Sequence, residues 1–150
     1  MKINVMKEFK VQSSKFRVFF ALFALCFSFL ADVHASPDSW MKVADEIEKA
    51  LNASIGAFEN GKKNEAMETV ADAYFGVFEG EKANMEIAVR RFINLKKSSE
   101  LEKGFADLRK AIKEGIKPAD FRKQTEGLIE AVKAAAKELD RKGVKVSSEF

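Results

Sequence analysis

Cysteine and histidine are nearly absent from this sequence. Its 150 residues contain one of each, Cys26 and His34, and both precede residue 36. The rest of the chain therefore cannot form a disulfide, a Ser-His-Asp or Cys-His nucleophile, a thiolate zinc site or a Cys-x-x-Cys-His haem attachment. The eight glycines are scattered, so a glycine-rich phosphate loop is missing too. We expect no enzyme, no haem or nucleotide cofactor and no disulfide partner.

Long hydrophobic runs are also lacking. The one clear apolar run, residues 18–30, has 13 residues, whereas a membrane-spanning helix needs about 20. Five basic residues precede this run, and Val33 and Ala35 provide small side chains at the third and first positions before a cleavage point. This pattern predicts a signal peptide over residues 1–35, cleaved after Ala35, and export of the remainder to the periplasm.

A charge excess of one sign is missing once residues 1–35 are set aside. The full chain has 26 Lys and Arg and 23 Asp and Glu; five basic and two acidic residues lie in residues 1–35, which leaves 21 of each sign. A nucleic-acid partner requires a basic excess that neutralises phosphates, so we expect none. The remaining 115 residues are enough to bury a hydrophobic core without disulfides.

What the sequence does contain is a series of amphipathic helical patterns. Apolar residues recur at spacings of three and four, and Gly or Pro separates the patterns. The predicted helices cover residues 38–60, 64–80 with Asn64 as N-cap, 83–95, 98 or 99 to 115, and 118–143, with a break or kink near Gly80 and Lys82. Because the connections are short, neighbouring helices should pack antiparallel. The predicted fold class is all-α, an up-and-down antiparallel bundle of four to five helices over residues 36–143, with residues 144–150 as a tail.

Aromatic and acidic residues are concentrated in the second and third predicted helices. Tyr74, Phe75 and Phe78 fall on the apolar face, where we expect them in the core rather than as a ligand platform. Acidic residues recur every seven positions at Glu65, Asp72, Glu79 and Glu86. On a continuous helix this line drifts toward the apolar face, so Glu79 and Glu86 would lie at its edge, partly desolvated.

These carboxylates are candidate ligands of a hard, oxygen-seeking cation. Neighbours in the line are about 10.5 Å apart along a helix axis, too far to share one ion, so a second helix must contribute. Asp45 and Glu46 in the first predicted helix, or Glu126 and Glu130 in the last, could do so, and Met85 could add a soft ligand. The alternative is a solvated acidic face that pairs with Lys and Arg.

The central motif resembles a known family. The run from Asp72 to Gly80, continued from Asn84 to Ala88, is similar to the soluble N-terminal extracytoplasmic domain that precedes the membrane portion in many bacterial iron/lead permeases. The matching residues are Ala73, Tyr74, Phe75, Phe78, Glu79, Met85, Glu86 and Ala88. The resemblance implies extracytoplasmic iron handling: capturing the ion or delivering it to a transport path. In an iron-binding module, Glu79 and Glu86 are the leading candidate ligands, followed by Asp72, Met85 and Glu46.

The chain departs from that family in one respect. It has no Arg-Glu-x-x-Glu motif and no apolar run after Leu30, so it is not itself a permease. The resemblance then implies a free-standing or truncated accessory domain that works beside a membrane-embedded iron permease. The alternative hypothesis is a helical interaction or sensor module that binds no metal.

Overall fold

The computed structural model describes residues 39–81 and 83–147, and the predicted signal peptide lies outside them. Its helices are α2 (Trp40–Glu59), α3 (Lys63–Ala71), the π-helix η1 (Asp72–Phe78), α4 (Met85–Phe92), α5 (Leu95–Glu114) and α6 (Pro118–Arg141). No strand occurs among the described residues, and the predicted all-α bundle is confirmed. Nor is any helix in this part of the chain long and apolar enough to cross a membrane.

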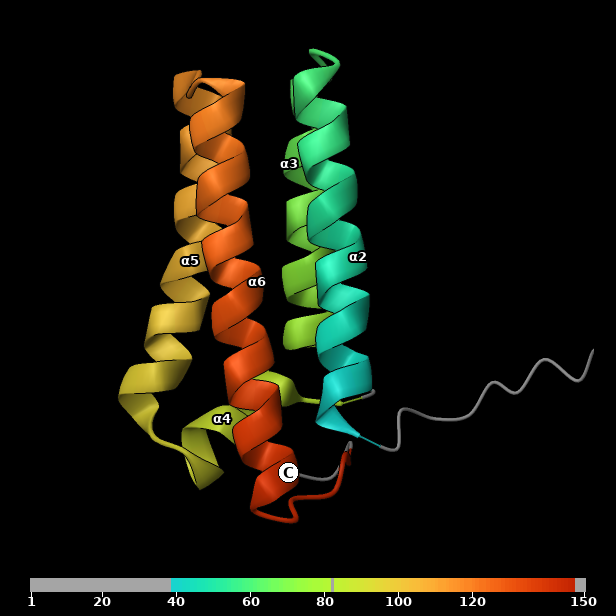
Figure 1. The fold of residues 1–150 in the computed structure, drawn as a ribbon, viewed down its shortest axis with the longest axis vertical. Helices are drawn as coiled ribbons and strands as arrows, with labels where there is room; N and C mark the ends of the chain where they lie inside the picture. The colour runs from blue at the N-terminus through green and yellow to red at the C-terminus, as the bar shows by residue number, and fades with distance from the viewer. Residues whose placement is uncertain (1–38, 82, 148–150) are drawn as a thin grey trace, which may run out of the picture. The chain divides into compact units, whose positions relative to one another are not determined.

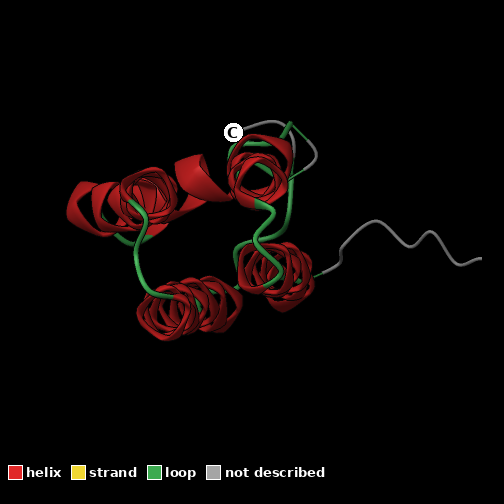
Figure 2. Ribbon diagram, turned by 90° about the horizontal axis from the view of Figure 1, so that it is seen from above, coloured by secondary structure: helices red, strands yellow, loops and turns green. Residues whose placement is uncertain are grey.

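Four helical columns form the bundle. Viewed from above, α2, α3 with η1, α5 and α6 stand at its corners (Figure 2). Each column packs on its two neighbours: α2 contacts α6 and α3, and α5 contacts α3 and α6. The columns alternate in direction, and the short helix α4 lies at the end of the bundle where α6 finishes (Figure 1). This arrangement brings α4 and the end of η1 beside the first half of α5.

The core follows the apolar spacing seen in the sequence. Its largest fully buried side chains come from every column and include Trp40, Ile47, Phe78, Phe105, Phe121 and Leu139. Among the described residues, no buried side-chain nitrogen or oxygen lacks a hydrogen-bond partner. The bundle is therefore held together by apolar burial with its interior polar groups satisfied.

Helices α5 and α3 begin earlier than predicted. Helix α5 begins at Leu95, because the Asn94 Oδ1 accepts the Lys97 backbone N–H at 2.7 Å and caps the helix four residues before Ser98. Helix α3 begins at Lys63, which places Asn64 inside the helix instead of at its N-cap. The predicted stop at Gly115 is confirmed: this residue adopts a left-handed φ of 77°, which glycine reaches without a steric penalty.

Helix η1 changes which aromatic side chains face the core. Its hydrogen bonds run from residue i to i+5, as from the Glu79 N–H to the Tyr74 carbonyl at 2.8 Å. The wider turn shifts the phase of the side chains relative to an α-helix. Phe78 is fully buried, but Phe75 is 57% exposed, so the prediction that Phe75 lies in the core is wrong.

The predicted break after η1 is confirmed. Residues 79–84 lie between η1 and α4 and carry no regular helix in their described positions. A Cβ atom at Gly80 would overlap the Gly76 carbonyl oxygen, so the chain requires glycine where it turns back. Asn84 then adopts a left-handed φ of 49°, a conformation that Asn tolerates better than most residues, and α4 starts in a new direction.

The segment after α6 packs on the bundle. The Trp40 indole N–H donates to the Val144 carbonyl at 2.7 Å, and Val144 and Val146 lie against the core. The Asp140 carboxylate accepts the backbone N–H groups of Trp40 and Met41 at 2.9 and 3.2 Å, so α6 caps the start of α2. Contacts of the bundle thus extend past the predicted boundary at residue 143.

Candidate functional site

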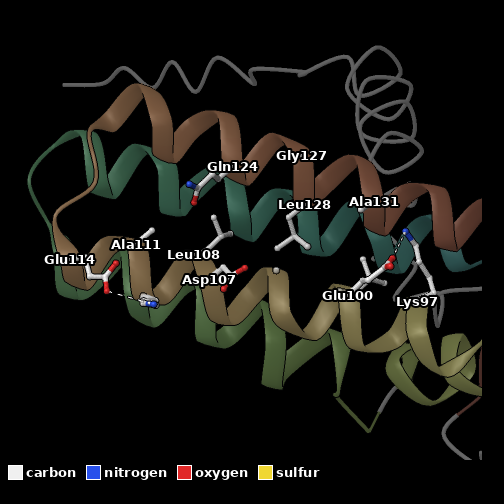
Figure 3. A pocket seen from close by; sticks show the side chains of 13 residues that line it. Lys97, Glu100, Asp107, Leu108, Ala111, Glu114, Gln124, Gly127, Leu128 and Ala131 are labelled. Atoms are coloured by element: carbon white, nitrogen blue, oxygen red, sulfur yellow. Dashed lines mark ion pairs between the residues drawn. The ribbon is translucent and has the colours of Figure 1, made fainter.

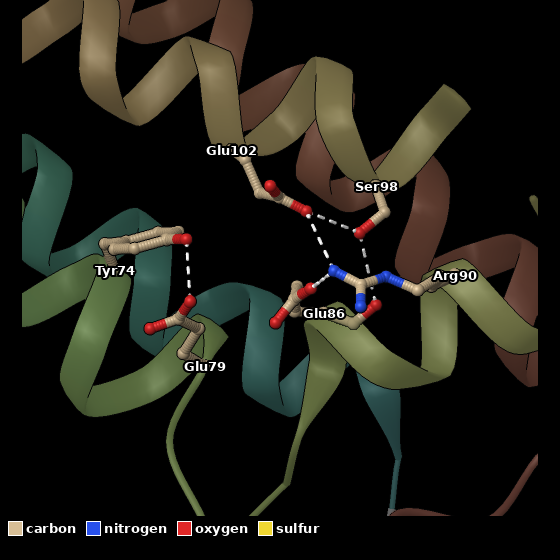
Figure 4. Close-up of polar contacts among 6 residues, drawn as sticks. All are labelled: Tyr74, Glu79, Glu86, Arg90, Ser98 and Glu102. Carbon is tan, nitrogen blue, oxygen red and sulfur yellow. Dashed lines mark hydrogen bonds and ion pairs between the residues drawn. The ribbon is translucent and has the colours of Figure 1, made fainter. Parts of the chain in front are cut away.

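Six polar residues meet where η1, α4 and α5 come together (Figure 4). Tyr74 lies in η1 and Glu79 directly follows this helix, α4 contributes Glu86 and Arg90, and α5 contributes Ser98 and Glu102. We call these six residues the acidic junction. Three of the six are glutamates from separate parts of the fold; Glu86 and Glu102 contact the Arg90 guanidinium, and Glu79 accepts a hydrogen bond from Tyr74.

The Tyr74 hydroxyl is fixed at one side of the acidic junction. It donates a hydrogen bond to the Glu79 Oε1 at 2.8 Å. Its ring packs between Phe78 and Phe105, with centroids 5.9 and 5.3 Å away. Burial raises the pKa of Tyr74, and the hydrogen bond to Glu79 and the charges of Glu79, Glu102 and Glu86 raise it further. The phenol therefore stays protonated at neutral pH and acts as a donor toward the carboxylates.

Arg90 links the other two glutamates. Its guanidinium is paired with the Glu86 Oε1, and its Nη2 is 3.6 Å from the Glu102 Oε1. The Ser98 hydroxyl donates to the same Glu102 oxygen at 2.9 Å. The Glu86 side chain is 12% exposed, whereas that of Arg90 is 49% exposed. The Arg90 guanidinium is thus more accessible to water than the Glu86 carboxylate that it neutralises.

The electrostatic balance at the junction is negative. Burial raises the pKa of Glu86; Arg90 opposes this shift, and the nearby Glu102 and Glu79 add to it. With three carboxylates and one guanidinium, the junction carries about two more negative than positive charges when all are ionised. As they stand, however, no three carboxylate, imidazole or thiol side chains among the described residues are arranged to hold a metal ion.

A shallow pocket adjoins the junction. It has a volume of about 350 Å³ and lies between η1 and α5, with Tyr74, Glu102, Phe105 and Arg109 among the residues that line it. The Tyr74 and Glu102 side chains belong to both the pocket and the junction. A small solute can therefore approach these two groups from solvent.

The structure brings together two of the predicted ligands and separates the others. Glu79 and Glu86 both lie at the junction, where each raises the pKa of Tyr74. Asp72 in η1 and Glu46 in α2 are exposed and are not among the groups that shift the pKa values of Tyr74 or Glu86. Met85 is completely buried in the core, so its thioether faces apolar neighbours.

Helices α2 and α6, which were expected to contribute a further carboxylate ligand, do not bring one to the junction. Asp45 in α2 lies 3.8 Å from Lys133, and Glu126 and Glu130 are exposed on α6. The additional member is Glu102 in α5, which the sequence analysis missed. Glu102 follows the buried Ser98 by four residues, so the two form a polar pair beside the apolar stripe of α5. The spacing does not reveal that α4 packs against this pair.

Comparisons with known proteins give no relative for this chain: no family model, no curated protein and no solved structure matches it. The resemblance to the iron/lead permease domain therefore remains a prediction from the motif.

The raised pKa of Glu86 predicts a specific pH dependence of stability. A carboxyl whose pKa is higher in the folded state than its ordinary 4.5 binds more protons folded than unfolded, so its contribution to stability falls as pH rises above 4.5. Glu86→Gln cannot ionise and should not show this loss. We expect the free energy of unfolding of the wild type to decrease relative to Glu86→Gln as pH rises from about 4 to about 8.

Urea unfolding at a series of pH values measures this difference. Glu126→Gln, the same substitution at an exposed position in α6, is the matched control. A difference between wild type and Glu86→Gln that does not vary with pH would show that folding does not raise the pKa of Glu86.

Proposed function

We propose that this protein is an exported, periplasmic helical module that binds iron, or another hard divalent or trivalent cation, at the acidic junction. In this proposal it supports uptake by a separate membrane-embedded permease. The observation that carries the proposal is the clustering of three glutamates from separate parts of the fold at the acidic junction, two of them paired with one half-exposed guanidinium. Glu79, Glu86 and Glu102 are the proposed ligands.

The chemistry of the junction suits a hard cation. Iron, manganese and similar ions accept carboxylate oxygens, and the junction offers three glutamates with negative charge in excess. Because Glu86 is mostly shielded from water, its attraction to a cation is stronger than that of a solvated carboxylate. Binding requires Glu79 and Glu102 to rotate toward Glu86 and Arg90 to move outward. The Arg90 side chain is half exposed, so it has room for that movement.

The predicted export signal and the family resemblance support the biological setting. A signal peptide over residues 1–35 would deliver the helical unit to the periplasm, where a permease collects its ion. The Ala-Tyr-Phe…Phe-Glu…Met-Glu motif that resembles the permease domain contains Tyr74, Glu79 and Glu86, which are three of the six residues at the junction. The motif and the polar cluster thus coincide.

Calorimetric titration with Fe(II), Fe(III) and Mn(II) tests the proposal. The chain from Ser36 to Phe150 is suitable because it forms one compact unit with its own core. We expect about one ion per chain, with affinity reduced at least about tenfold in Glu86→Gln and in Glu102→Gln because each removes one charged ligand. Glu126→Gln and Glu130→Gln, at exposed positions on α6, should bind like the wild type.

Two outcomes would refute the cation proposal. One is the absence of both heat and a thermal shift with all three ions. The other is binding that Glu86→Gln and Glu102→Gln leave unchanged. The first result would favour the second candidate, an interaction module, for which the specific observation is the exposed Phe75 side chain next to Tyr74 on η1. The second result would place the ion at another site.

A further inference from the structure

A groove runs between α5 and α6, on a different part of α5 from the acidic junction (Figure 3). Its volume is about 490 Å³. Leu101, Leu108 and Leu128 line it together with the small residues Gly104, Gly127 and Ala131. The groove therefore combines apolar side chains with positions where the helix backbone is close to the surface.

Two glycines shape this groove in different ways. A Cβ atom at Gly104 would lie 2.6 Å from the Leu128 Cδ1, so glycine allows the leucine of α6 to pack directly on α5. At Gly127 an added Cβ would have no atom within 4 Å, so the space above α6 is open. A partner helix could approach closely at Gly127 and Ala131, where little side chain intervenes.

The charges along the α5 side of the groove occur in the same order, Lys before Glu, at both ends of the helix. Lys97 and Glu100 stand near the start of the helix, and Lys110 and Glu114 near its end. Within the chain they form long pairs at the surface: Glu100 lies 3.9 Å from both Lys96 and Lys97, and Lys110 lies 3.8 Å from Glu114. Such pairs contribute little to stability, so exchanging their partners costs little.

We propose that this groove is the self-association surface of the protein, and that its occupant is a second copy of the same chain. The two α5 helices would run antiparallel about a two-fold axis that crosses α5 midway between Gly104 and Asp107, so that Asp107 lies opposite Gly104 of the other copy. Lys97 of each copy then lies opposite Glu114 of the other, and Glu100 lies opposite Lys110. A two-fold axis repeats each of these contacts, so four opposite-charge pairs form.

The charge order distinguishes this arrangement from others. A parallel pairing in register would place Lys97 beside Lys97 and Glu100 beside Glu100, which is unfavourable. The segment from Lys97 to Glu114 spans about 25 Å, and two adjacent helices are about 20 Å wide. Each copy can therefore bury about 500–600 Å², which brings the total near the lower limit of specific interfaces, at about 1,200 Å². We expect a weak, salt-sensitive dimer.

Charge exchange between two variants tests the pairing directly. The acidic variant carries Lys97→Glu and Lys110→Glu, and the basic variant carries Glu100→Lys and Glu114→Lys. Sedimentation of residues 36–150 should show a dimer for the wild type and at least about tenfold weaker dimerisation for each variant alone. An equimolar mixture of the two variants should recover the dimer, because every contact across the axis again joins opposite charges.

Control variants match the change in net charge. Lys49→Glu with Lys137→Glu, on exposed parts of α2 and α6 outside the groove, should dimerise like the wild type. So should Glu126→Lys with Glu130→Lys, two further exposed positions that do not line the groove. Circular dichroism checks that all variants fold.

Three results would overturn the proposal. A wild type that stays monomeric up to about 1 mM is one of them. Another is a dimer that both groove variants retain, which would locate the interface elsewhere. The third is a mixture of folded acidic and basic variants that does not dimerise although the wild type does.

Discussion

Phe78→Ala is expected to lower the free energy of unfolding by about 3–5 kcal/mol, because truncating a fully buried Phe removes apolar contacts and leaves a cavity. The Phe78 ring packs against Tyr74 and Phe105, with centroids 5.9 and 5.4 Å away, so the cavity would open beside the acidic junction. Phe75→Ala, three residues earlier in η1, should change stability by less than about 1 kcal/mol, since Phe75 is 57% exposed.

The pair of variants also tests the π-helix. Both residues are phenylalanine and both lie in η1, so helix propensity and side-chain entropy nearly cancel between them. Urea unfolding followed by circular dichroism gives the two free energies. Equal losses for Phe75→Ala and Phe78→Ala would mean that both rings are buried, as on a continuous α-helix, and would contradict the phase that η1 imposes.

Helix periodicity and helix stops could be predicted from the sequence because they depend on local spacing. Trp40, Val43, Ile47 and Leu51 recur at three and four residues, and all four are buried in α2. Gly115 ends α5 because a left-handed residue is needed there. The phase of η1 could not be predicted, because a π-helix is stabilised by tertiary packing around it and leaves no period of its own in seven residues.

The candidate site was predictable in part for a similar reason. Glu79 and Glu86 belong to a motif within one stretch of chain, and that stretch also contains the break that separates them. Glu102 lies sixteen residues beyond Glu86 on another helix, and only the packing of α4 on α5 brings the two together. When ligands come from separate helices, their arrangement depends on how those helices pack together. The spacing of residues along the chain does not predict that packing.

The break at residues 79–84 connects the fold to the candidate site. On an uninterrupted helix, Glu79 and Glu86 would lie about 10.5 Å apart along the axis, too far for one ion. The chain turns at Gly80, directly after the segment in which Tyr74 and Phe78 pack against the bundle. After this turn, α4 packs against α5. As a result both glutamates raise the pKa of one tyrosine. The same turn that interrupts the helix thus assembles the acidic junction.

Trp40→Ala is the second substitution for which we expect a loss of about 3–5 kcal/mol in the free energy of unfolding. Trp40 is completely buried at the start of α2. Its indole N–H donates to the Val144 carbonyl at 2.7 Å, which links the start of α2 to the segment after α6. Trp40→Phe keeps most of the apolar contact but loses this hydrogen bond, so we expect a smaller loss of about 1–2 kcal/mol. Urea unfolding followed by circular dichroism measures both variants.

A truncation after Gly143 separates the hydrogen bond from the packing. The truncated chain lacks the Val144 carbonyl, so Trp40→Phe should cost less in the truncated background than in the full one, and the difference is the coupling between Trp40 and Val144. If Trp40→Phe costs the same in both backgrounds, the indole N–H does not stabilise the docking of residues 144–147. If Trp40→Ala costs less than about 1 kcal/mol, the start of α2 is not part of the core that the bundle needs in order to fold.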